Sequence, residues 1–431
     1  MALYRQYRFK STQDQRLGSL TFSQGHDRME TIANPTTLCS SMSYNIRVDH
    51  IRRRIARCPK QEGVELSAEY LRTHGADVFN HQHFALALED MKLDQKPHIC
   101  RLCHPSYRDS KNKWQTTQWS VNNFKNLKIN TTPAAICDYI FSDVCNMTCM
   151  YCDAYHSNQW AKLTNDPQPM NQEWDSAAED CLVDYLNRYI INQVPQFRIQ
   201  MLGGEPLLNW NKLEKFLLRI TKVFEHTDTE LTIAVISNLN VLQKNVENFV
   251  KFSEQHNIKT EIQGSIDTVG ATAENIRTGL NFDLFVSNMD IFASRSQIQC
   301  SINASVNLLS VSTMPQHYQY WTDYAVRHQR TLGKDFLFGN NTVTNPKSMS
   351  ITILPKSYID YIEKSREILN KSFSDNSYTQ TLNRRFDILA NNIGIDRNEK
   401  NLQNAKQFYT QQGLLKGIDY FKVFPELGSI L

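Results

Sequence analysis

Three cysteines lie close together in the run Val144-Cys-Asn-Met-Thr-Cys-Met-Tyr-Cys-Asp153, and their CxxxCxxC spacing constrains this chain more than any other feature. Four thiolates close a four-iron, four-sulfur cluster, whereas three thiolates leave one iron free to bind a group that is not protein. The spacing therefore predicts a loop that surrounds a reactive metal centre. The alternative is a zinc site that pairs Cys100-x-x-Cys103 with Cys149-x-x-Cys152, although this separation exceeds the roughly 15 to 20 residues of compact zinc ribbons.

The composition is that of an ordinary globular protein, with 431 residues of which 41% are apolar. This length suits about two or three domains. Apolar runs such as residues 233–236 are far shorter than the roughly 18 residues that span a bilayer, so we expect no membrane segment. No apolar stretch follows the charged N-terminus, which predicts a cytoplasmic protein with reduced cysteines. The net charge of +3 is too small to imply a nucleic-acid partner.

The pattern of apolar and polar residues along the chain changes at about residue 134. Residues 1–130 are polar and irregular, which predicts a loop-rich, cysteine-containing region. Beyond it, short apolar runs alternate with helical spacing, which is the βα pattern of a parallel sheet. The expected strands are residues 134–141, 196–202, 231–237, 259–266, 298–305 and 348–354, with 336–338 as an alternative to the last. The expected helices are residues 174–191, 210–224, 241–252, 273–291 and 318–328, followed by a helical tail with 358–369 and 401–411.

The second expected strand ends in Met201-Leu-Gly-Gly-Glu-Pro-Leu-Leu208. Paired glycines allow a backbone to approach a ligand closely, and the Glu205 carboxylate can accept hydrogen bonds from an ammonium group. The cysteine run follows the first expected strand in the same way. Because ligands gather at the carboxyl ends of parallel strands, we expect these two motifs to form one site.

Together these motifs resemble the radical S-adenosylmethionine superfamily over about residues 131–345. The resemblance implies an α/β fold, a partial (β/α)6 TIM-like barrel. It also implies that Cys145, Cys149 and Cys152 hold a [4Fe-4S] cluster whose open iron chelates S-adenosylmethionine. Tyr151 matches the aromatic residue beside the adenine. The family's ammonium-binding motif corresponds to Gly203, Gly204 and Glu205.

The resemblance continues at the ends of the next strands. Ser237 and Asn238 match a polar position near the ligand, and Ser265 and Asp267 match an element that reaches the ribose and carboxylate. Arg277 falls where related proteins carry an arginine near the carboxylate. Residues 300–303 are a weaker match to a ribose-contacting strand. Each position also has a plainer interpretation, as a strand-end turn, a helix cap or a solvated helix face.

The chemistry that the resemblance implies is reductive cleavage of S-adenosylmethionine to methionine and a 5′-deoxyadenosyl radical, which abstracts hydrogen from a substrate. An electron donor such as flavodoxin or ferredoxin is implied as a partner. The protein would fix the open iron's ligand, tune the cluster's potential and exclude water.

A second set of cysteines precedes the core. Cys39, Cys100 and Cys103 resemble the ligands of an auxiliary iron-sulfur cluster in the twitch/SPASM-like subgroup, in forms whose cysteine-rich segment is N-terminal to the core. The chain departs from relatives with adjacent cysteines because Ser40 follows Cys39, and Cys58 is a candidate fourth ligand. Zinc or inert thiols are the alternatives. The expected domains are an auxiliary-cluster region (1–130), the core (131–345) and a C-terminal extension (346–431).

Our leading hypothesis is therefore a radical S-adenosylmethionine enzyme, with a peptide favoured as substrate by analogy with the subgroup. The alternative is a non-catalytic iron-sulfur or zinc-binding protein that binds an anionic partner through its basic N-terminal region. The basic run consists of Arg52, Arg53, Arg54 and Arg57, and its plainer interpretation is a solvated helix face. This alternative gives no role to the Gly203-Gly-Glu-Pro206 motif.

Overall fold

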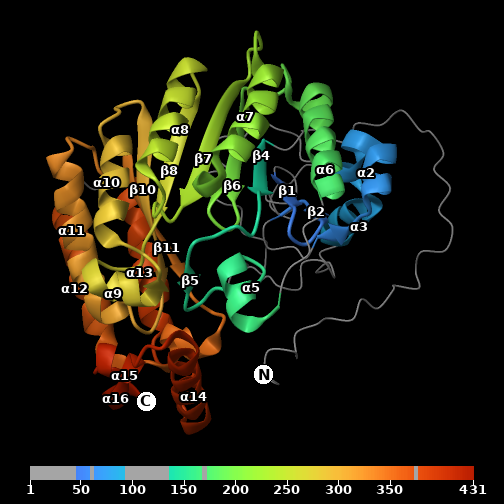
Figure 1. The fold of residues 1–431 in the computed structure, drawn as a ribbon. Helices are drawn as coiled ribbons and strands as arrows, with labels where there is room; N and C mark the ends of the chain where they lie inside the picture. Colours follow the sequence, from blue (N-terminus) through green and yellow to red (C-terminus); the bar gives the residue numbers. More distant parts are fainter. Residues whose placement is uncertain (1–44, 59–62, 93–134, 167–171, 373–376) are drawn as a thin grey trace. The chain divides into compact units, whose positions relative to one another are not determined.

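The computed structural model describes residues 45–58, 63–92, 135–166, 172–372 and 377–431 (Figure 1). These residues belong to one compact unit that begins at Thr36. Within them, nine strands form a single sheet in the order β11-β10-β8-β7-β6-β4-β1-β2-β3. A separate two-stranded ladder joins β5 and β9.

Six strands form the parallel centre of the sheet, and each pairs with the next one along this series. They are β4 (Ile136–Ile140), β6 (Gln196–Leu202), β7 (Glu230–Ser237), β8 (Lys259–Ser265), β10 (Ile298–Val306) and β11 (Phe336–Thr342). In the described residues β11 has no strand on its outer side, so the sheet does not close into a full barrel. The predicted α/β fold, a partial barrel of six parallel strands, is confirmed.

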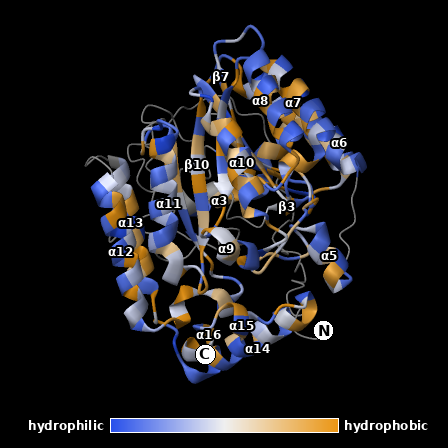
Figure 2. Cartoon of the chain, turned by 60° about the vertical axis from the view of Figure 1, so that its left-hand side comes forward, coloured by the Kyte–Doolittle hydropathy of each residue, from blue (hydrophilic) through white to orange (hydrophobic). Residues whose placement is uncertain are grey.

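Buried and partly buried side chains alternate along the strands, which explains how the sheet packs against its helices. In β6, Phe197, Ile199 and Met201 are buried while the residues between them are only partly buried. Helix α7 (Trp210–Phe224) buries one stripe of apolar side chains, including Leu213 and Phe216. Figure 2 shows hydrophobic residues along β10 and mixed hydrophilic and hydrophobic faces on α7 and α8 (Gln243–Gln255). Burial of these faces supplies the main favourable term for the fold.

Two of the predicted elements are wrong. Residues 348–354 form the 3-10 turns η8 (Lys347–Met349) and η9 (Ile351–Ile353), and the sixth strand is β11, which the sequence offered only as the alternative. Buried apolar side chains in both turns produce a pattern like that of a short strand.

The expected helix 273–291 is interrupted. Helix α9 (Gly270–Ile276) ends before β9 (Arg277–Thr278), and α10 (Phe282–Ala293) begins after it. Gly279 has a φ of 102° between them, a conformation that favours glycine. The interruption matters because β9 pairs with β5 (Thr148–Cys149) of the cysteine run.

The N-terminal region contains more strands and helices than its polar, irregular sequence predicted. Strand β1 (Asn45–Asp49) pairs in parallel with β4, and β2 (Arg54–Ala56) and β3 (Val64–Glu65) extend the sheet. These strands are too short to produce a clear pattern in the sequence. The helical segments α2 (Ala68–His74), η2 (Gly75–Asn80) and α3 (Gln82–Lys92) follow. The domain boundary at residue 130 remains a proposal.

The run of arginines is not a solvated helix face, which corrects that interpretation. Arg54 lies in β2, and Arg53 directly precedes this strand. Their guanidinium groups lie 3.7 Å (Arg54) and 3.8 Å (Arg53) from the Glu65 carboxylate. Arg57 is buried and donates to the Phe79 carbonyl oxygen at 3.4 Å.

The remaining elements of the described chain are helical. Helix α6 (Gln172–Tyr185) follows α5 (Asn158–Thr164), and α11 (Met314–Arg327) follows β10. The C-terminal tail is helical as expected, although α13 was missed. It comprises α12 (Ile359–Ser372), α13 (Ser377–Asn392), α14 (Glu399–Lys416), α15 (Tyr420–Val423) and α16 (Leu427–Ile430). Of the helices described, none combines the length and apolar character needed to cross a bilayer.

Candidate functional site

The three central cysteines lie on one loop between β4 and α5. Cys145 is buried, Cys149 is half-buried in β5, and the Cys152 amide donates to the Cys149 carbonyl oxygen at 3.1 Å. The start of α5 holds this loop in place. The Asn158 side chain accepts from the Cys145 amide at 3.1 Å, and the Trp160 indole donates to the Cys149 carbonyl oxygen at 2.9 Å. The sequence therefore folds the triad against its own following helix.

The thiols are electrostatically coupled and poorly suited to carry charge unaided. Burial, together with the neighbouring Cys149 thiolate, raises the pKa of Cys145 to about 12. Burial and the same neighbour raise the pKa of Cys152 well above its ordinary value. The pKa of Cys149 is raised by burial, although the nearby Arg277 opposes this shift. Bound metal would provide the positive charge that stabilises all three thiolates.

The donor set fits an iron-sulfur cluster. No group of three or more His, Cys, Asp or Glu side chains in the described residues is arranged to hold a single metal ion. Cysteine thiolates such as those of Cys145, Cys149 and Cys152 are the usual ligands of iron-sulfur clusters. Cys39, Cys100 and Cys103 lie outside the described residues, so neither the auxiliary cluster nor the alternative zinc pairing can be placed. Cys58, the candidate fourth ligand, is described and is buried in the hydrophobic core.

The paired glycines approach the cysteine loop itself. The Gly204 amide donates to the Ser142 carbonyl oxygen at 2.7 Å, and the Glu205 amide donates to the Val144 carbonyl oxygen at 2.8 Å. A Cβ atom at Gly204 would lie 2.3 Å from that Val144 oxygen, and one at Gly203 would lie 2.4 Å from the Ser142 oxygen. The approach to a ligand remains a prediction, whereas the structure shows that both glycines are required by the backbone just before Cys145.

Glu205 is buried and links the ends of two strands. Its carboxylate accepts from the Ser237 hydroxyl at 2.8 Å, from the Asn238 amide and from the Leu207 amide at 3.1 Å. The last bond caps the turn η6 (Pro206–Asn209). Burial raises the pKa of Glu205 to about 7, although these donors oppose the shift. Two carboxylate oxygens offer about four acceptor positions, so one remains for a further donor.

Asn238 connects this carboxylate to the cysteine loop. Its side-chain amide lies 3.8 Å from the Cys145 sulfur and donates to the Asn146 side chain at 3.0 Å. Hydrogen bonds to cluster sulfurs are one of the means by which a protein tunes the potential of an iron-sulfur centre. The predicted positions Glu205, Ser237 and Asn238 thus lie together beside Cys145.

A second group lies beside Cys149. Asp267 is buried and accepts from the Tyr151 hydroxyl at 2.7 Å, from the Ser305 amide at 2.9 Å and from Arg277. Arg277 belongs to β9, where it is the register partner of Cys149. The predicted residues Tyr151, Asp267 and Arg277 are therefore in direct contact. Ser265 is half-buried at the end of β8, with Asn303 of β10 as its register partner.

Sequence reasoning missed a polar row on the sheet. Arg198 of β6 donates to Glu261 of β8 at 2.8 Å and to Gln200. These side chains alternate with the buried apolar ones and so occupy the opposite face of their strands. On β10, Asn303 lies on the corresponding face and accepts from Asn341 at 3.0 Å. A polar residue at every second strand position is the signal that could have revealed this row.

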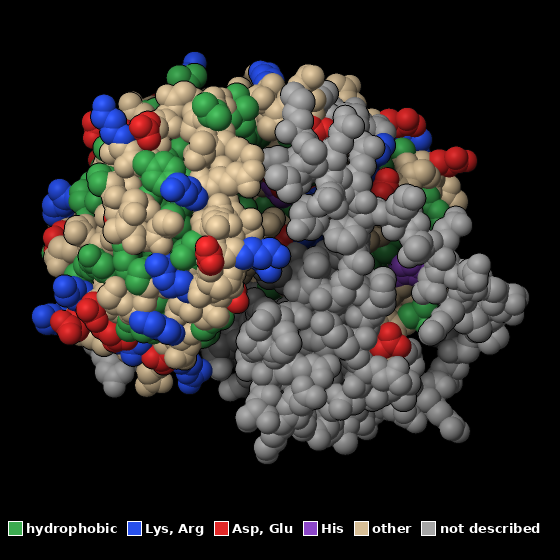
Figure 3. All heavy atoms as spheres, turned by 90° about the horizontal axis from the view of Figure 1, so that it is seen from below, with side chains coloured by type: hydrophobic (Ala, Val, Ile, Leu, Met, Phe, Trp, Pro, Cys, Tyr) green, Lys and Arg blue, Asp and Glu red, His purple; other side chains and the backbone are tan. Residues whose placement is uncertain are grey.

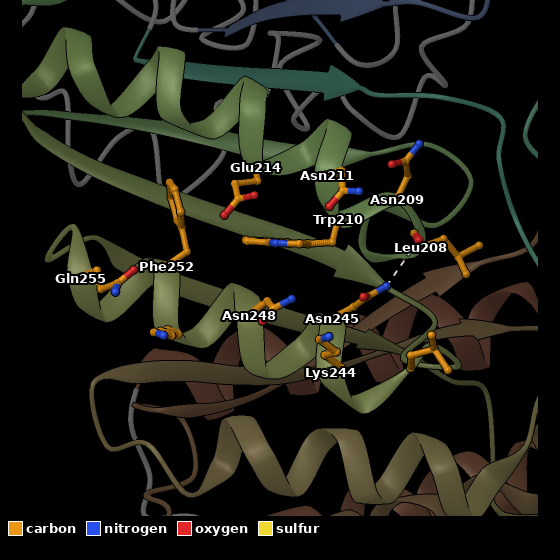
Figure 4. Close-up of a pocket in the computed structure, with 12 residues that line it drawn as sticks. Leu208, Asn209, Trp210, Asn211, Glu214, Lys244, Asn245, Asn248, Phe252 and Gln255 are labelled. Carbon is orange, nitrogen blue, oxygen red and sulfur yellow. Dashed lines mark hydrogen bonds between the residues drawn. The ribbon is translucent and has the colours of Figure 1, made fainter.

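One surface groove lies apart from these residues. A groove of about 590 Å³ runs between α7 and α8, with Trp210, Asn245 and Phe252 among its lining residues (Figure 4). It contains none of the predicted site residues. Figure 3 shows Lys and Arg interspersed with Asp and Glu over the described part of the face seen from below.

Comparisons with known proteins connect this site to iron-sulfur proteins. Residues 136–268 match the model of a family described as "4Fe-4S single cluster domain". An uncharacterised protein of Methanocaldococcus jannaschii is 27% identical over 107 residues, which are 25% of this chain and 31% of that protein.

Two solved structures are also similar. The structure of anSMEcpe with bound AdoMet and a peptide is 17% identical, with a TM-score of 0.38, over 55% of this chain and 61% of that one. The structure of Streptococcus suis SuiB bound to S-adenosylmethionine is 15% identical, also with a TM-score of 0.38, over 72% of this chain and 64% of that one. The chain thus spans less than two thirds of the length of each of these relatives.

The family match runs from β4 to the residue after Asp267 and includes the cysteine triad and Glu205. The segment that the motifs single out is thus similar to an iron-sulfur domain.

Proposed function

We propose that this protein is a radical S-adenosylmethionine enzyme. The observation that carries the proposal is the contact between its two motifs. The cysteine loop after β4 and the Gly203-Gly-Glu-Pro206 segment after β6 are hydrogen-bonded to each other at the carboxyl edge of the parallel sheet. This edge is where parallel α/β proteins bind ligands.

Cys145, Cys149 and Cys152 are the proposed ligands of a [4Fe-4S] cluster, with one iron left open for S-adenosylmethionine. When bound, the reduced cluster supplies the electron that cleaves S-adenosylmethionine into methionine and a 5′-deoxyadenosyl radical, which takes hydrogen from the substrate. The chain's own residues bind and orient these groups, and exclude water from them.

Glu205 is the proposed acceptor for the ammonium group of the methionine moiety. Its buried carboxylate is oriented by Ser237 and Asn238, which leaves little freedom for the side chain to move. An arriving cation would favour the ionised carboxylate, which burial alone disfavours. Gly203 and Gly204 bring this carboxylate close to the cysteine loop.

Tyr151 is the proposed adenine neighbour. Its hydroxyl donates to Asp267, which also binds Arg277, so the aromatic ring is fixed from one edge. Ser265 and the end of β10 are the proposed ribose contacts. Because Asp267 neutralises Arg277, we assign this arginine a positioning role beside Cys149 in addition to any contact with the cofactor's carboxylate.

A peptide is the proposed substrate. The polar row on the sheet offers donors and acceptors suited to a backbone with many hydrogen-bonding groups. It consists of Arg198, Gln200, Glu261, Asn303 and Asn341.

An external one-electron donor such as flavodoxin or ferredoxin is the proposed partner. The cytoplasm is the proposed compartment, because cluster ligands must be reduced thiolates.

A second cluster held by Cys39, Cys100 and Cys103 is a further proposal, which rests on the sequence resemblance. Anaerobic reconstitution followed by iron and sulfide analysis tests it. About eight irons per chain are expected with two clusters and about four with one. The variant Cys100→Ser should then lose about four irons, and an unchanged iron content would contradict the second cluster.

Binding of S-adenosylmethionine by the reconstituted protein tests the main proposal. Calorimetry should detect binding to the wild-type chain and to Cys300→Ala, in which a buried cysteine outside the loop is replaced. Binding should be lost in Cys149→Ala. Equal affinity in all three would contradict a cofactor held by the open iron.

A further inference from the structure

A lysine of the C-terminal extension reaches the cysteine loop. Lys416 is the last residue of α14, and its ammonium group donates to the Thr148 carbonyl oxygen at 2.6 Å. The same nitrogen lies 3.4 Å from the Thr278 hydroxyl. Thr148 and Thr278 are register partners in the β5-β9 ladder, so Lys416 joins both strands of that ladder. Lys416 and Thr148 are 268 residues apart in the chain.

An aromatic ring completes the environment of this ammonium group. The Lys416 nitrogen lies 4.6 Å from the centre of the Trp160 ring, within the range of a cation-π interaction. The Trp160 indole in turn donates to the Cys149 carbonyl oxygen. Lys416 therefore contacts the residue before Cys149 directly and the Cys149 backbone through Trp160.

The charge of Lys416 interacts with the thiols of Cys149 and Cys152. Burial lowers the pKa of Lys416 to about 8, and the thiolates of Cys149 and Cys152 oppose this shift. The ammonium group in turn favours the Cys149 thiolate. Within the described residues, Lys416 has no carboxylate partner to neutralise it. Its charge therefore acts on the cysteine loop more strongly than the charge of a surface lysine held in an ion pair.

We propose that Lys416 is a positioning residue for the iron-sulfur site, which anchors the loop at Thr148 and holds a positive charge beside Cys149. The proposal rests on the proposed function, since it assumes a cluster on the triad. One-electron reduction makes a cluster more negative, and a nearby cation stabilises the reduced form. Lys416 thus raises the reduction potential of the site and makes the C-terminal extension part of it.

A redox titration followed by electron paramagnetic resonance tests the effect of the charge. In Lys416→Met the ratio of reduced to oxidised cluster at a fixed potential should fall about tenfold, which corresponds to 59 mV for a one-electron couple. Lys416→Arg should stay near the wild-type potential because it keeps the charge. The exposed Lys406 of the same helix provides the control Lys406→Met, which should titrate like wild type. A wild-type potential in Lys416→Met would overturn the electrostatic role.

Hydrogen exchange on the cluster-free protein tests the anchor separately. The Met150 amide donates to the Ile276 carbonyl oxygen at 3.0 Å and reports on the β5-β9 ladder. Peptides that cover residues 146–152 and 276–280 should exchange several-fold faster in Lys416→Met than in Lys406→Met. Equal exchange would overturn the anchoring role.

The two measurements also separate this inference from the proposed function. A wild-type chain that binds no cluster would overturn the proposed function and the effect on potential, while the exchange data would still decide the anchor. A chain that binds a cluster and keeps its potential in Lys416→Met would overturn only the electrostatic role. Thermal unfolding of both variants shows whether either substitution affects the whole fold.

Discussion

The guanidinium group of Arg277 binds the Asp267 carboxylate through two hydrogen bonds, one of 3.1 Å from Nε and one of 2.9 Å from Nη2. Both side chains are buried, and the Tyr151 hydroxyl donates to the same carboxylate. Because Arg277 follows α9 and is paired with Cys149, this ion pair fixes β9 against the cysteine loop. Residues that the sequence assigns to separate contacts with a cofactor are thus in direct contact with one another.

Breaking this ion pair should destabilise the fold strongly. We expect Arg277→Met to lower the free energy of unfolding by about 3 to 5 kcal/mol, because it leaves the buried Asp267 carboxylate without its partner. Arg277→Lys should recover only part of this loss, since an ammonium group cannot make the two-point contact. Urea unfolding checks both values. A loss of under ~1 kcal/mol in Arg277→Met would contradict the structural role.

A methyl group at Gly204 should disturb the contact between the two motifs. Its Cβ atom would lie 2.3 Å from the Val144 carbonyl oxygen, so the loop before Cys145 must move. We expect Gly204→Ala to cost about 1 to 3 kcal/mol in unfolding experiments and to lower the iron content after reconstitution. Gly428→Ala is the matched control, because nothing lies within 4 Å of a Cβ atom there. Similar stability and iron content in the two variants would count against this contact.

Glu205 should make stability depend on pH. Burial raises its pKa in the folded protein from 4.5 to about 7, so the folded state favours the protonated form. The stability gained from this group is therefore fully present below about pH 4.5 and is lost as the pH rises to about 7. The loss amounts to ~3 kcal/mol at most, at about 1.36 kcal/mol per pKa unit.

Urea unfolding of the cluster-free protein at pH 5 and pH 7.5 checks this dependence. Wild type should lose more stability than Glu205→Gln over this interval, because glutamine does not titrate. The exposed Glu247 gives the control Glu247→Gln, which should follow wild type. Identical behaviour of Glu205→Gln and wild type would show that Glu205 does not titrate in this range.

Much of the core could be predicted from the sequence because each βα unit carries its own local pattern. Strands β6, β7, β8 and β10 were all expected, and their predicted bounds differ from the observed ones by one residue at most. The strand ends then bring Cys145, Glu205 and Asn238 together, since parallel strands end at the same edge.

The elements and contacts that the sequence did not predict depend on residues far apart in the chain. Residues 348–354 have the apolar content of a strand, but their side chains are buried by 3-10 turns. The break at Arg277 depends on pairing with Cys149, and helical spacing on both sides conceals it. Lys416 meets Thr148 across 268 residues, so no local pattern could connect them. The assignment of Cys39, Cys100 and Cys103 remains a prediction, because these residues lie outside those described.

Formation of 5′-deoxyadenosine tests the central claim most directly. The reconstituted protein is incubated anaerobically with dithionite and S-adenosylmethionine, and the product is quantified by chromatography. Wild type and the control Cys300→Ala should form 5′-deoxyadenosine, while Cys149→Ala should form none because an iron ligand is lost. No product from wild type, or equal product from Cys149→Ala, would contradict a radical S-adenosylmethionine enzyme.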